Sequence, residues 1–301
     1  MNRPAPESRP RYRGRFAPSP SGPLHLGSLV AALGSWLDAR AAGGEWLLRM
    51  EDIDPPREQP GAAQDILRTL EAYGLHWDGP VTWQSERSAA YAAALQTLQP
   101  LLFWCTCTRA ELRAAKGVYP GTCHARRAPP DEKHAAVRLR TPEPLPGFRD
   151  RMQGDLTLAA KDTGTDPILR RKDGLWAYQL AVVVDDGAQG ITHVVRGNDL
   201  LNTTPLQVAL QQCLGLPTPD YLHLPVIQDQ QGRKLSKQNH APAIRARDSD
   251  RLLRAALLAL GLTPPADLLP TELLPWGTEH WVNRQHRLHS VQPSELSGAD
   301  V

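Results

Sequence analysis

The sequence predicts an α/β protein built on a parallel sheet, and three observations support this class. A strand at 15–17, a tight turn, a helix at 26–42 and a strand at 45–50 follow one another in the order of a βαβ unit. The continuous apolar run at 180–184 is typical of a strand buried on both faces. Between them, residues 102–176 are rich in cysteine, proline and glycine and favour short strands, so we expect an insertion into the α/β frame.

The other elements follow from local signals along the chain. Glycines at 43 and 44 end the first helix, and apolar residues at helical spacing predict two more helices before the insertion, around 66–73 and at 85–98. Thr204 and Pro205 are typical of a helix start. The remaining expected elements are strands at 136–139, 156–160, 168–171, 191–195 and 221–227 and helices at 205–214 and 248–261.

The composition is that of a folded globular protein. The 301 residues include 34 Lys and Arg against 32 Asp and Glu, with 41% hydrophobic and 22% charged residues, which argues against disorder or a coiled coil. The apolar runs end well before the ~18 residues of a membrane span, and the N-terminal segment lacks the apolar stretch of about 7 to 15 residues of a signal peptide. We therefore expect a cytoplasmic protein without a membrane partner, whose four cysteines are reduced unless they bind a metal.

The first candidate site is RFAPSPSGPLHLGS, residues 15–28, where a proline-rich turn runs into a helix. His25, Gly27 and Ser28 fall in the first helical turn, so backbone N–H groups and an imidazole would face one point. Helix N-termini attract anions, and Gly27 lets a phosphate approach the backbone closely. A turn with a helix cap and a surface histidine is the plainer alternative.

The second candidate is KLSK, residues 234–237, about 210 residues after His25. Two lysines three residues apart can bind a polyphosphate, and one positioned donor to a reacting phosphorus is worth roughly 10²- to 10³-fold in rate. Taken by itself, a solvated lysine pair is the simpler interpretation. No dinucleotide fingerprint or Walker motif is present.

Together, HLGS and KLSKQ resemble the two signature motifs of class I aminoacyl-tRNA synthetases. Ser28 and Gln238 depart from the usual signatures, as is common in the glutamate branch. Five further segments, in the same order along the chain, are similar to the glutamyl-tRNA synthetase branch, and the resemblance covers about residues 13–245. KLSKQNHAPA and the Cys-x-Cys cluster resemble the short paralogues of that branch that glutamylate queuosine in tRNA(Asp). The five segments are MEDIDPPRE (50–58), YGLHWDG (73–79), YQLAVVVDD (178–186), VVRGNDLL (194–201) and YLHLPV (221–226).

The resemblance implies a Rossmann-like parallel-sheet nucleotide-binding domain with an inserted α+β zinc-bearing subdomain and a short helical C-terminal appendix. We expect the first half of the catalytic domain at 1–101, the inserted acceptor-type subdomain at 102–176, the second catalytic half at 177–245 and the C-terminal region at 246–301.

The resemblance also implies ATP-dependent, tRNA-independent activation of L-glutamate, with Mg²⁺ bound to the ATP. His25 and Lys237 are the expected catalytic residues. By charge, Arg15 and Arg196 suit the two carboxylates of glutamate and Glu51 suits its ammonium, although each could instead be a surface ion-pair partner. The implied ATP-binding residues are His25, Gly27, Ser28, Lys234, Ser236 and Lys237, and the implied glutamate-binding residues are Arg15, Phe16, Ala17, Pro18, Ser19, Glu51, Tyr178 and Arg196.

The third candidate is a metal site. Cys105, Cys107 and Cys123 lie within 19 residues of one another and suggest one structural Zn²⁺ that lacks a fourth protein ligand. Tyr119, His124 or water could complete the site, and the resemblance points to Tyr119. Three reduced thiols packed as small hydrophobes are the alternative.

The acceptor is inferred from length and resemblance. The 63 residues after Gln238 are too few for an anticodon-binding domain of about 100 residues or more. The resemblance implies that the anticodon loop of tRNA(Asp) enters the site and that queuosine takes the glutamyl group, in a monomeric enzyme. The alternatives are a truncated glutamyl-tRNA synthetase that charges a tRNA 3′ end, a small-molecule nucleotidyltransferase, and a non-catalytic relic that binds RNA or an amino acid.

Overall fold

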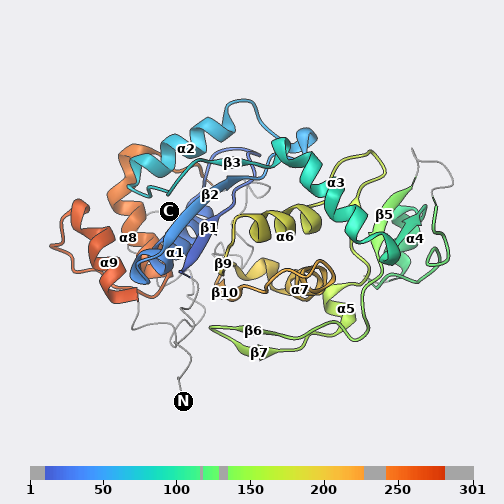
Figure 1. Cartoon of the computed structure of the whole chain (residues 1–301). Coiled ribbons are helices and arrows are strands. Elements are labelled where there is room, and N and C mark those ends of the chain that lie inside the picture. The colour runs from blue at the N-terminus through green and yellow to red at the C-terminus, as the bar shows by residue number, and fades with distance from the viewer. Residues whose placement is uncertain (1–10, 116–117, 129–134, 227–241, 282–301) are drawn as a thin grey trace, which may run out of the picture.

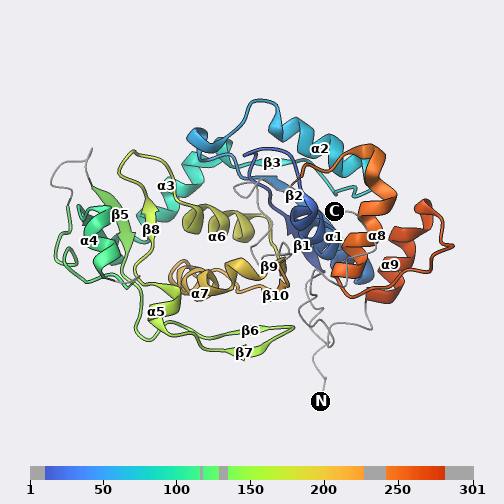
Figure 2. The same ribbon diagram turned by 180° about the vertical axis from the view of Figure 1, so that it is seen from behind.

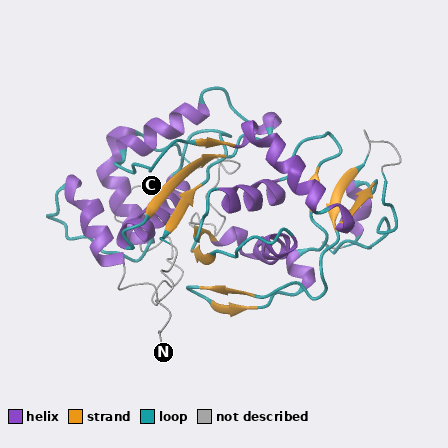
Figure 3. Ribbon diagram, viewed as in Figure 1, coloured by secondary structure: helices purple, strands orange, loops and turns teal. Residues whose placement is uncertain are grey.

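The computed structural model describes residues 11–115, 118–128, 135–226 and 242–281, and it confirms the α/β class. Strands β1, β2 and β3 form one parallel sheet. In a second sheet β9, β10 and β6 are parallel, and β7 is antiparallel to β6 at the edge (Figures 1 and 3). The strands of these sheets are β1 (Arg13–Phe16), β2 (Glu45–Met50), β3 (Thr82–Trp83), β6 (Phe148–Asp150), β7 (Gly154–Leu156), β9 (His193–Gly197) and β10 (Asp220–Leu224).

The two sheets meet between β1 and β9. The Thr192 N–H donates to the Arg13 carbonyl at 2.9 Å, so the edge of one sheet continues into the other. The carboxyl ends of β1, β2 and β9 therefore point toward one region, which is where ligands bind in open parallel sheets.

Helix α1 (Leu26–Ala41) is the central helix of the larger core. It packs against β1, β2 and β9 and also contacts α8 and α9. Gly34 allows this close packing, because a Cβ there would lie 2.5 Å from Leu224 Cδ1 of β10. Figures 1 and 2 show α8 and α9 at one end of the molecule, with α6 and α7 nearer its centre. The helices outside the insertion are α2 (Ala62–Ala72), α3 (Ser88–Thr97), α6 (Tyr178–Ala188), α7 (Thr204–Cys213), α8 (Ser249–Ala259) and α9 (Leu273–Trp281).

Three strands at the other end of the molecule form a separate antiparallel sheet in the order β4-β5-β8. The β6–β7 hairpin, which lies between β5 and β8 in the chain, instead pairs with β10 of the second parallel sheet. The domain boundaries expected from the sequence stay a prediction. This inserted part contains β4 (Leu102–Cys105), β5 (Ala136–Leu139), β8 (Ile168–Arg170), α4 (Arg109–Ala114) and α5 (Ala160–Thr163).

The strand predicted at 180–184 is wrong, since these residues lie within helix α6. Leu180, Ala181, Val182 and Val183 are all at most 1% exposed. A helix buried on nearly every side has no polar face, and a short apolar run cannot distinguish it from a buried strand. Among the described residues, no helix is both long enough and apolar enough to span a bilayer.

Asp38 of α1 joins distant parts of the catalytic core. It is 2% exposed and accepts hydrogen bonds from the Tyr12 hydroxyl, from both terminal nitrogens of Arg151 at 2.6 and 2.8 Å, and from Trp281 Nε1 at 2.7 Å. One carboxylate therefore links the chain before β1, the segment after β6 and the end of α9.

We predict that Asp38→Ala lowers the free energy of unfolding by about 3 to 5 kcal/mol, because it leaves a partly buried guanidinium without its partner. Chemical denaturation measures this change. The matched control is Asp65→Ala, whose partner Arg68 is 69% exposed and whose loss should cost about 0 to 1 kcal/mol. Equal losses in the two variants would contradict the role assigned to Asp38.

Candidate active site

His25 is the N-cap of α1, and Ser28 completes a capping box with it. The Ser28 N–H donates to His25 Nδ1 at 3.2 Å, and the His25 N–H donates to Ser28 Oγ at 2.7 Å. Because Nδ1 accepts an amide proton, the proton of the neutral ring lies on Nε2. Nε2 is therefore the ring atom that can donate to an anion at the helix N-terminus.

The chain that follows the second motif returns to this helix start. Ala243 forms an antiparallel bridge with His25, and the Ile244 N–H donates to the Leu24 carbonyl at 3.0 Å. The predicted ATP-binding residues of the second motif lie outside the described residues, namely Lys234, Ser236 and Lys237.

Asp186 of α6 joins two arginines of the parallel sheet. Arg15 donates from Nε and Nη2 to its two oxygens at 3.1 and 3.3 Å, and Arg49 Nη1 donates to Oδ1 at 2.8 Å. Arg15 is 4% exposed and Arg49 is fully buried. Burial opposes ionisation of Asp186, but the two guanidinium groups hold its pKa below the usual value. Asp186 is therefore a carboxylate that fixes both cations.

Arg196 of β9 is held by three buried acceptors. His223 in turn contacts Asp150, since its Nδ1 lies 2.8 Å from Asp150 Oδ2. Because His223 Nε2 accepts from the guanidinium, the imidazole is neutral with its proton on Nδ1. This network fixes the orientation of Arg196. The three acceptors are His223 Nε2 at 3.1 Å, Gln207 Oε1 at 2.8 Å and Thr204 Oγ1 at 2.8 Å.

Glu51 follows β2 and is 9% exposed. Its N–H donates to the Pro18 carbonyl at 3.0 Å, which holds it beside the turn after β1. Within the described part of the chain its Oε1 lacks a hydrogen-bond partner, and Arg49 Nη2 lies 3.6 Å away. Burial raises the pKa of Glu51 to about 7, and Arg49 and Arg15 oppose this rise.

These groups supply both kinds of charge that an acidic amino acid requires. Arg15 and Arg49 lie beside Asp186 and Glu51, and Arg196 is held through His223 and Asp150, so guanidinium groups and a carboxylate are all present at the site. Glutamate carries two carboxylates and one ammonium, and therefore one net negative charge. The arrangement suits a small ligand of that kind.

A cavity of about 400 Å³ opens beside Glu51. Of the predicted glutamate-binding residues, Ser19, Glu51 and Tyr178 line it, whereas Phe16 lies in the core and stacks on Trp46 with 6.2 Å between ring centroids. Arg15, Ala17, Pro18 and Arg196 are not among its lining residues. The other lining residues are Pro20, Ser21, Ile53, Asp54, Arg57, Glu58, Gln84, Ile168, Arg171, Trp176 and Ala177.

Sequence reasoning missed Arg49 and the way Asp186 is used. The sequence signal for Arg49 is a single charge inside the otherwise apolar end of β2. Asp186 has the two guanidinium contacts described above, and its position in the sequence gives no sign of them.

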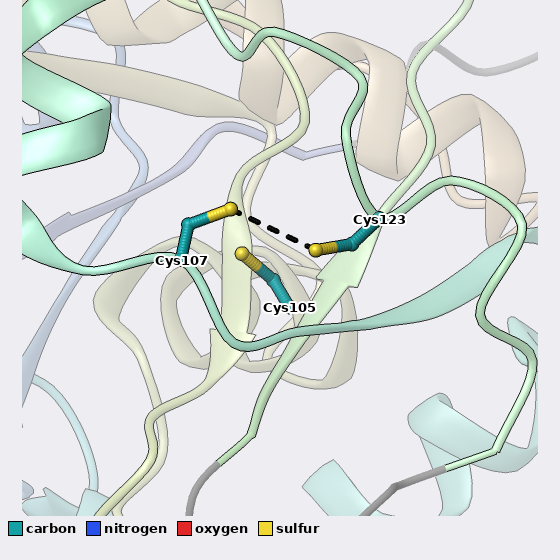
Figure 4. A group of neighbouring side chains, drawn as sticks. All are labelled: Cys105, Cys107 and Cys123. Carbon is teal, nitrogen blue, oxygen red and sulfur yellow. Dashed lines mark hydrogen bonds between the residues drawn. The ribbon is translucent and has the colours of Figure 1, made fainter.

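The three cysteines of the insertion converge (Figure 4). The Sγ atoms of Cys105, Cys107 and Cys123 all lie within 4.8 Å of one another, with 3.7 Å between those of Cys107 and Cys123. The Tyr119 hydroxyl lies 3.8 Å from Cys107 Sγ. Ligands at about 2.3 Å from a tetrahedral Zn²⁺ lie about 3.8 Å apart. His124 Nε2 instead contacts Asp166 Oδ2 at 2.6 Å.

The family model described as tRNA synthetases class I (E and Q), catalytic domain, matches residues 11–266. This chain therefore belongs to the class I glutamyl and glutaminyl tRNA synthetase family, and the resemblance seen in the sequence is confirmed.

Relatives within this family share more than half of their residues with the chain. It is 54% identical over 275 residues to the glutamyl-Q tRNA(Asp) synthetase of Ectopseudomonas mendocina, covering 90% of this chain and 93% of the relative. It is 56% identical over 280 residues to the enzyme of that name from Thiobacillus denitrificans, covering 89% of this chain and 92% of the relative. The Escherichia coli K12 relative of the same name is 52% identical over 291 residues, covering 95% of this chain and 92% of the relative.

Solved structures agree with this placement. The glutamate-tRNA synthetase of Elizabethkingia anophelis superposes with a TM-score of 0.77 at 25% identity, covering 95% of this chain and 69% of that chain. A glutamate tRNA ligase of Elizabethkingia meningosepticum in complex with its amino acid superposes with a TM-score of 0.73 at 26% identity, covering 88% of this chain and 64% of that chain.

We predict that glutamate use depends on the ionisation of Glu51. The ammonium of glutamate requires the carboxylate form of Glu51, and burial raises the pKa of this carboxyl group to about 7. The kcat/KM for glutamate should therefore fall about tenfold for each pH unit below 7 and level off above it. The rate of glutamate-dependent exchange between ATP and pyrophosphate measures this profile. In Glu51→Gln the exchange rate should be low and independent of pH across this range. The exposed control Glu71→Gln should keep the wild-type pH profile. A wild-type pH profile in Glu51→Gln would contradict the role assigned to Glu51.

Proposed function

We propose that this chain activates L-glutamate with ATP, without tRNA, and transfers the glutamyl group to queuosine in the anticodon of tRNA(Asp). The buried guanidinium groups of Arg15 and Arg196 and the carboxylate of Glu51 support the first part, because they offer partners for the two carboxylates and the ammonium of glutamate. The names of the relatives support the acceptor.

In the first step, an oxygen of the glutamate α-carboxylate attacks the α-phosphorus of ATP, and the bond to pyrophosphate breaks. Glu51 holds the ammonium, and Arg15 and Arg196 orient the two carboxylates. His25 Nε2 and the N–H group of Gly27 donate to the phosphates at the start of α1, while the Ser28 N–H keeps His25 in place. In this proposal Lys234, Ser236 and Lys237 bind the same triphosphate, and Mg²⁺ offsets its charge.

In the second step, a hydroxyl of the queuosine cyclopentene diol attacks the carbonyl carbon of glutamyl adenylate. The new ester forms as the bond to AMP breaks, and the hydroxyl proton leaves to a base or to water. The reaction needs no protein nucleophile. Trp176 and Arg171 also line the cavity beside Glu51, and in this proposal the acceptor enters on their side.

Exchange of pyrophosphate into ATP in the absence of tRNA tests the first step, and transfer of labelled glutamate to tRNA(Asp) with and without queuosine tests the second. We expect exchange, and transfer only to the queuosine-containing RNA. Equal charging of both RNAs would favour a truncated synthetase that charges the 3′ end, and absence of exchange would exclude the enzyme.

We predict that Arg196→Lys raises the KM for glutamate by roughly 10- to 100-fold and leaves the KM for ATP unchanged, since a charged hydrogen bond is worth about 1.5 to 3 kcal/mol and lysine lacks the planar fork. Steady-state exchange kinetics measure both constants. Arg68→Lys, on the exposed face of α2, is the control. An equal rise of both KM values would point to a general distortion instead.

We also propose that Cys105, Cys107, Cys123 and Tyr119 bind one structural Zn²⁺. The convergence of three thiols and the phenol supports this set. The metal would hold the chain after β4 to the segment around Cys123, within the insertion that carries β4, β5 and β8. Thiols that bind a metal instead of forming disulfides are typical of a reducing compartment, so we propose a cytoplasmic location.

We predict about one zinc per chain by elemental analysis and a clear loss of zinc in Cys107→Ser. Tyr119→Phe should retain the ring and weaken zinc binding. Cys213→Ser is the matched control, because Cys213 lies on α7 outside the cluster. A zinc-free preparation with full activity would contradict the site.

We propose that the chain is a monomer. On the surface of the described residues, the exposed large hydrophobic side chains are Leu101 and Leu269. Two separate leucines do not form the apolar patch of an obligate interface. Light scattering of the full chain tests this.

A further inference from the structure

A second cavity, of about 830 Å³, lies across a tight turn from the cavity beside Glu51. The turn spans residues 170–176. It is closed by hydrogen bonds from the Arg171 N–H to the Leu175 carbonyl at 2.8 Å and from the Gly174 N–H to the Arg171 carbonyl at 3.0 Å. Gly174 has a φ of +86°, which favours glycine. Arg171 lines both cavities, so they are neighbours separated by this turn.

The turn is held in place from both sides. Arg171 pairs with Asp54 at 3.0 Å and with Asp173 at 2.6 Å. The Arg170 guanidinium lies 5.3 Å from the centre of the Trp176 ring, in the wall of the first cavity. Lys172 Nζ donates to two backbone carbonyls of the cysteine segment, those of Thr106 and Cys107 at 2.7 and 2.9 Å. The wall between the cavities is thus firmly attached, and Asp54 and Asp173 offset part of its positive charge.

The second cavity combines apolar and polar linings. Its apolar part includes Trp104 of β4, which is half-buried. Exposed amides of Gln96 and Gln99 stand at its edge, together with the cations of the turn. An aromatic ring beside amides and arginines is the combination that binds single-stranded RNA, in which a base stacks on the ring and a phosphate meets the cations.

We infer that the second cavity binds a nucleotide of the RNA loop next to the one that accepts the glutamyl group. This inference rests on the proposed function. In this inference the acceptor occupies the first cavity, and its neighbour in the strand crosses the wall beside Arg170 and stacks on Trp104 in the second cavity. A loop whose bases are splayed out is the usual form in which RNA is read by proteins.

The test uses transfer of glutamate to a queuosine-containing anticodon stem–loop of tRNA(Asp). Trp104→Ala should lower kcat/KM for this RNA about tenfold, because stacking of one base is worth roughly 1 to 3 kcal/mol, whereas Trp104→Phe keeps a ring and should retain most activity. Exchange between ATP and pyrophosphate should be unchanged, which also shows that the catalytic core is folded. Removal of one base beside queuosine should abolish the difference between wild type and Trp104→Ala.

A second pair of variants avoids changing the packing. Gln99→Glu places a negative charge at the exposed edge of the second cavity and should raise the KM for the RNA roughly fivefold at low salt. The matched control is Gln64→Glu, on the exposed face of α2, which should have no effect.

Unchanged transfer in both Trp104→Ala and Gln99→Glu would overturn the inference. It would also be overturned if the loss in Trp104→Ala stayed the same whichever neighbouring base is removed, since the tryptophan would then act on the fold alone. Failure of the proposed function is distinguishable, because wild type would then perform exchange without transferring glutamate to any queuosine-containing RNA.

Discussion

The ion pairs of Asp186 with Arg15 and Arg49 are the interaction on which the site depends. They join α6 to β1 and β2, and all three groups are buried. Buried charges require oppositely charged partners at hydrogen-bonding distance, because removing a charge from water costs free energy. One carboxylate shared by two guanidinium groups leaves the set one negative charge short, and Glu51 supplies that charge when it is ionised. An ammonium group of a bound ligand would find a charged partner in Glu51, whose Oε1 accepts no hydrogen bond within the described residues.

The two halves of the catalytic fold supply different parts of this chemistry. The first half provides Arg15, Glu51 and the helix start at His25. The second half provides Asp186, and Arg196 in its network with His223. Neither half has a complete set, so the site exists only when β1 and β9 lie side by side. The capping box explains why Ser28 can stand where class I signatures often have a second histidine: it orients the first one.

Much of the fold and part of the site could be predicted from the sequence. The βαβ start was clear because Gly43 and Gly44 mark the end of α1, and β2 and β5 have the predicted bounds. The prediction of a strand at 180–184 was wrong because a short apolar run has the same composition in a buried strand and in a buried helix. The role of Arg49 could not be seen either, since its partners Asp186 and Gln189 lie more than 130 residues away along the chain. The cysteine cluster was visible because its members are close in the sequence.

The most direct measurement of the central claim is a crystal structure of the chain with L-glutamate bound. The account predicts the ammonium within hydrogen-bonding distance of Glu51 and the two carboxylates on Arg15 and Arg196. A glutamate bound instead at the outer end of the cavity, beside Arg57 and Trp176 and without contact to Glu51, would contradict it.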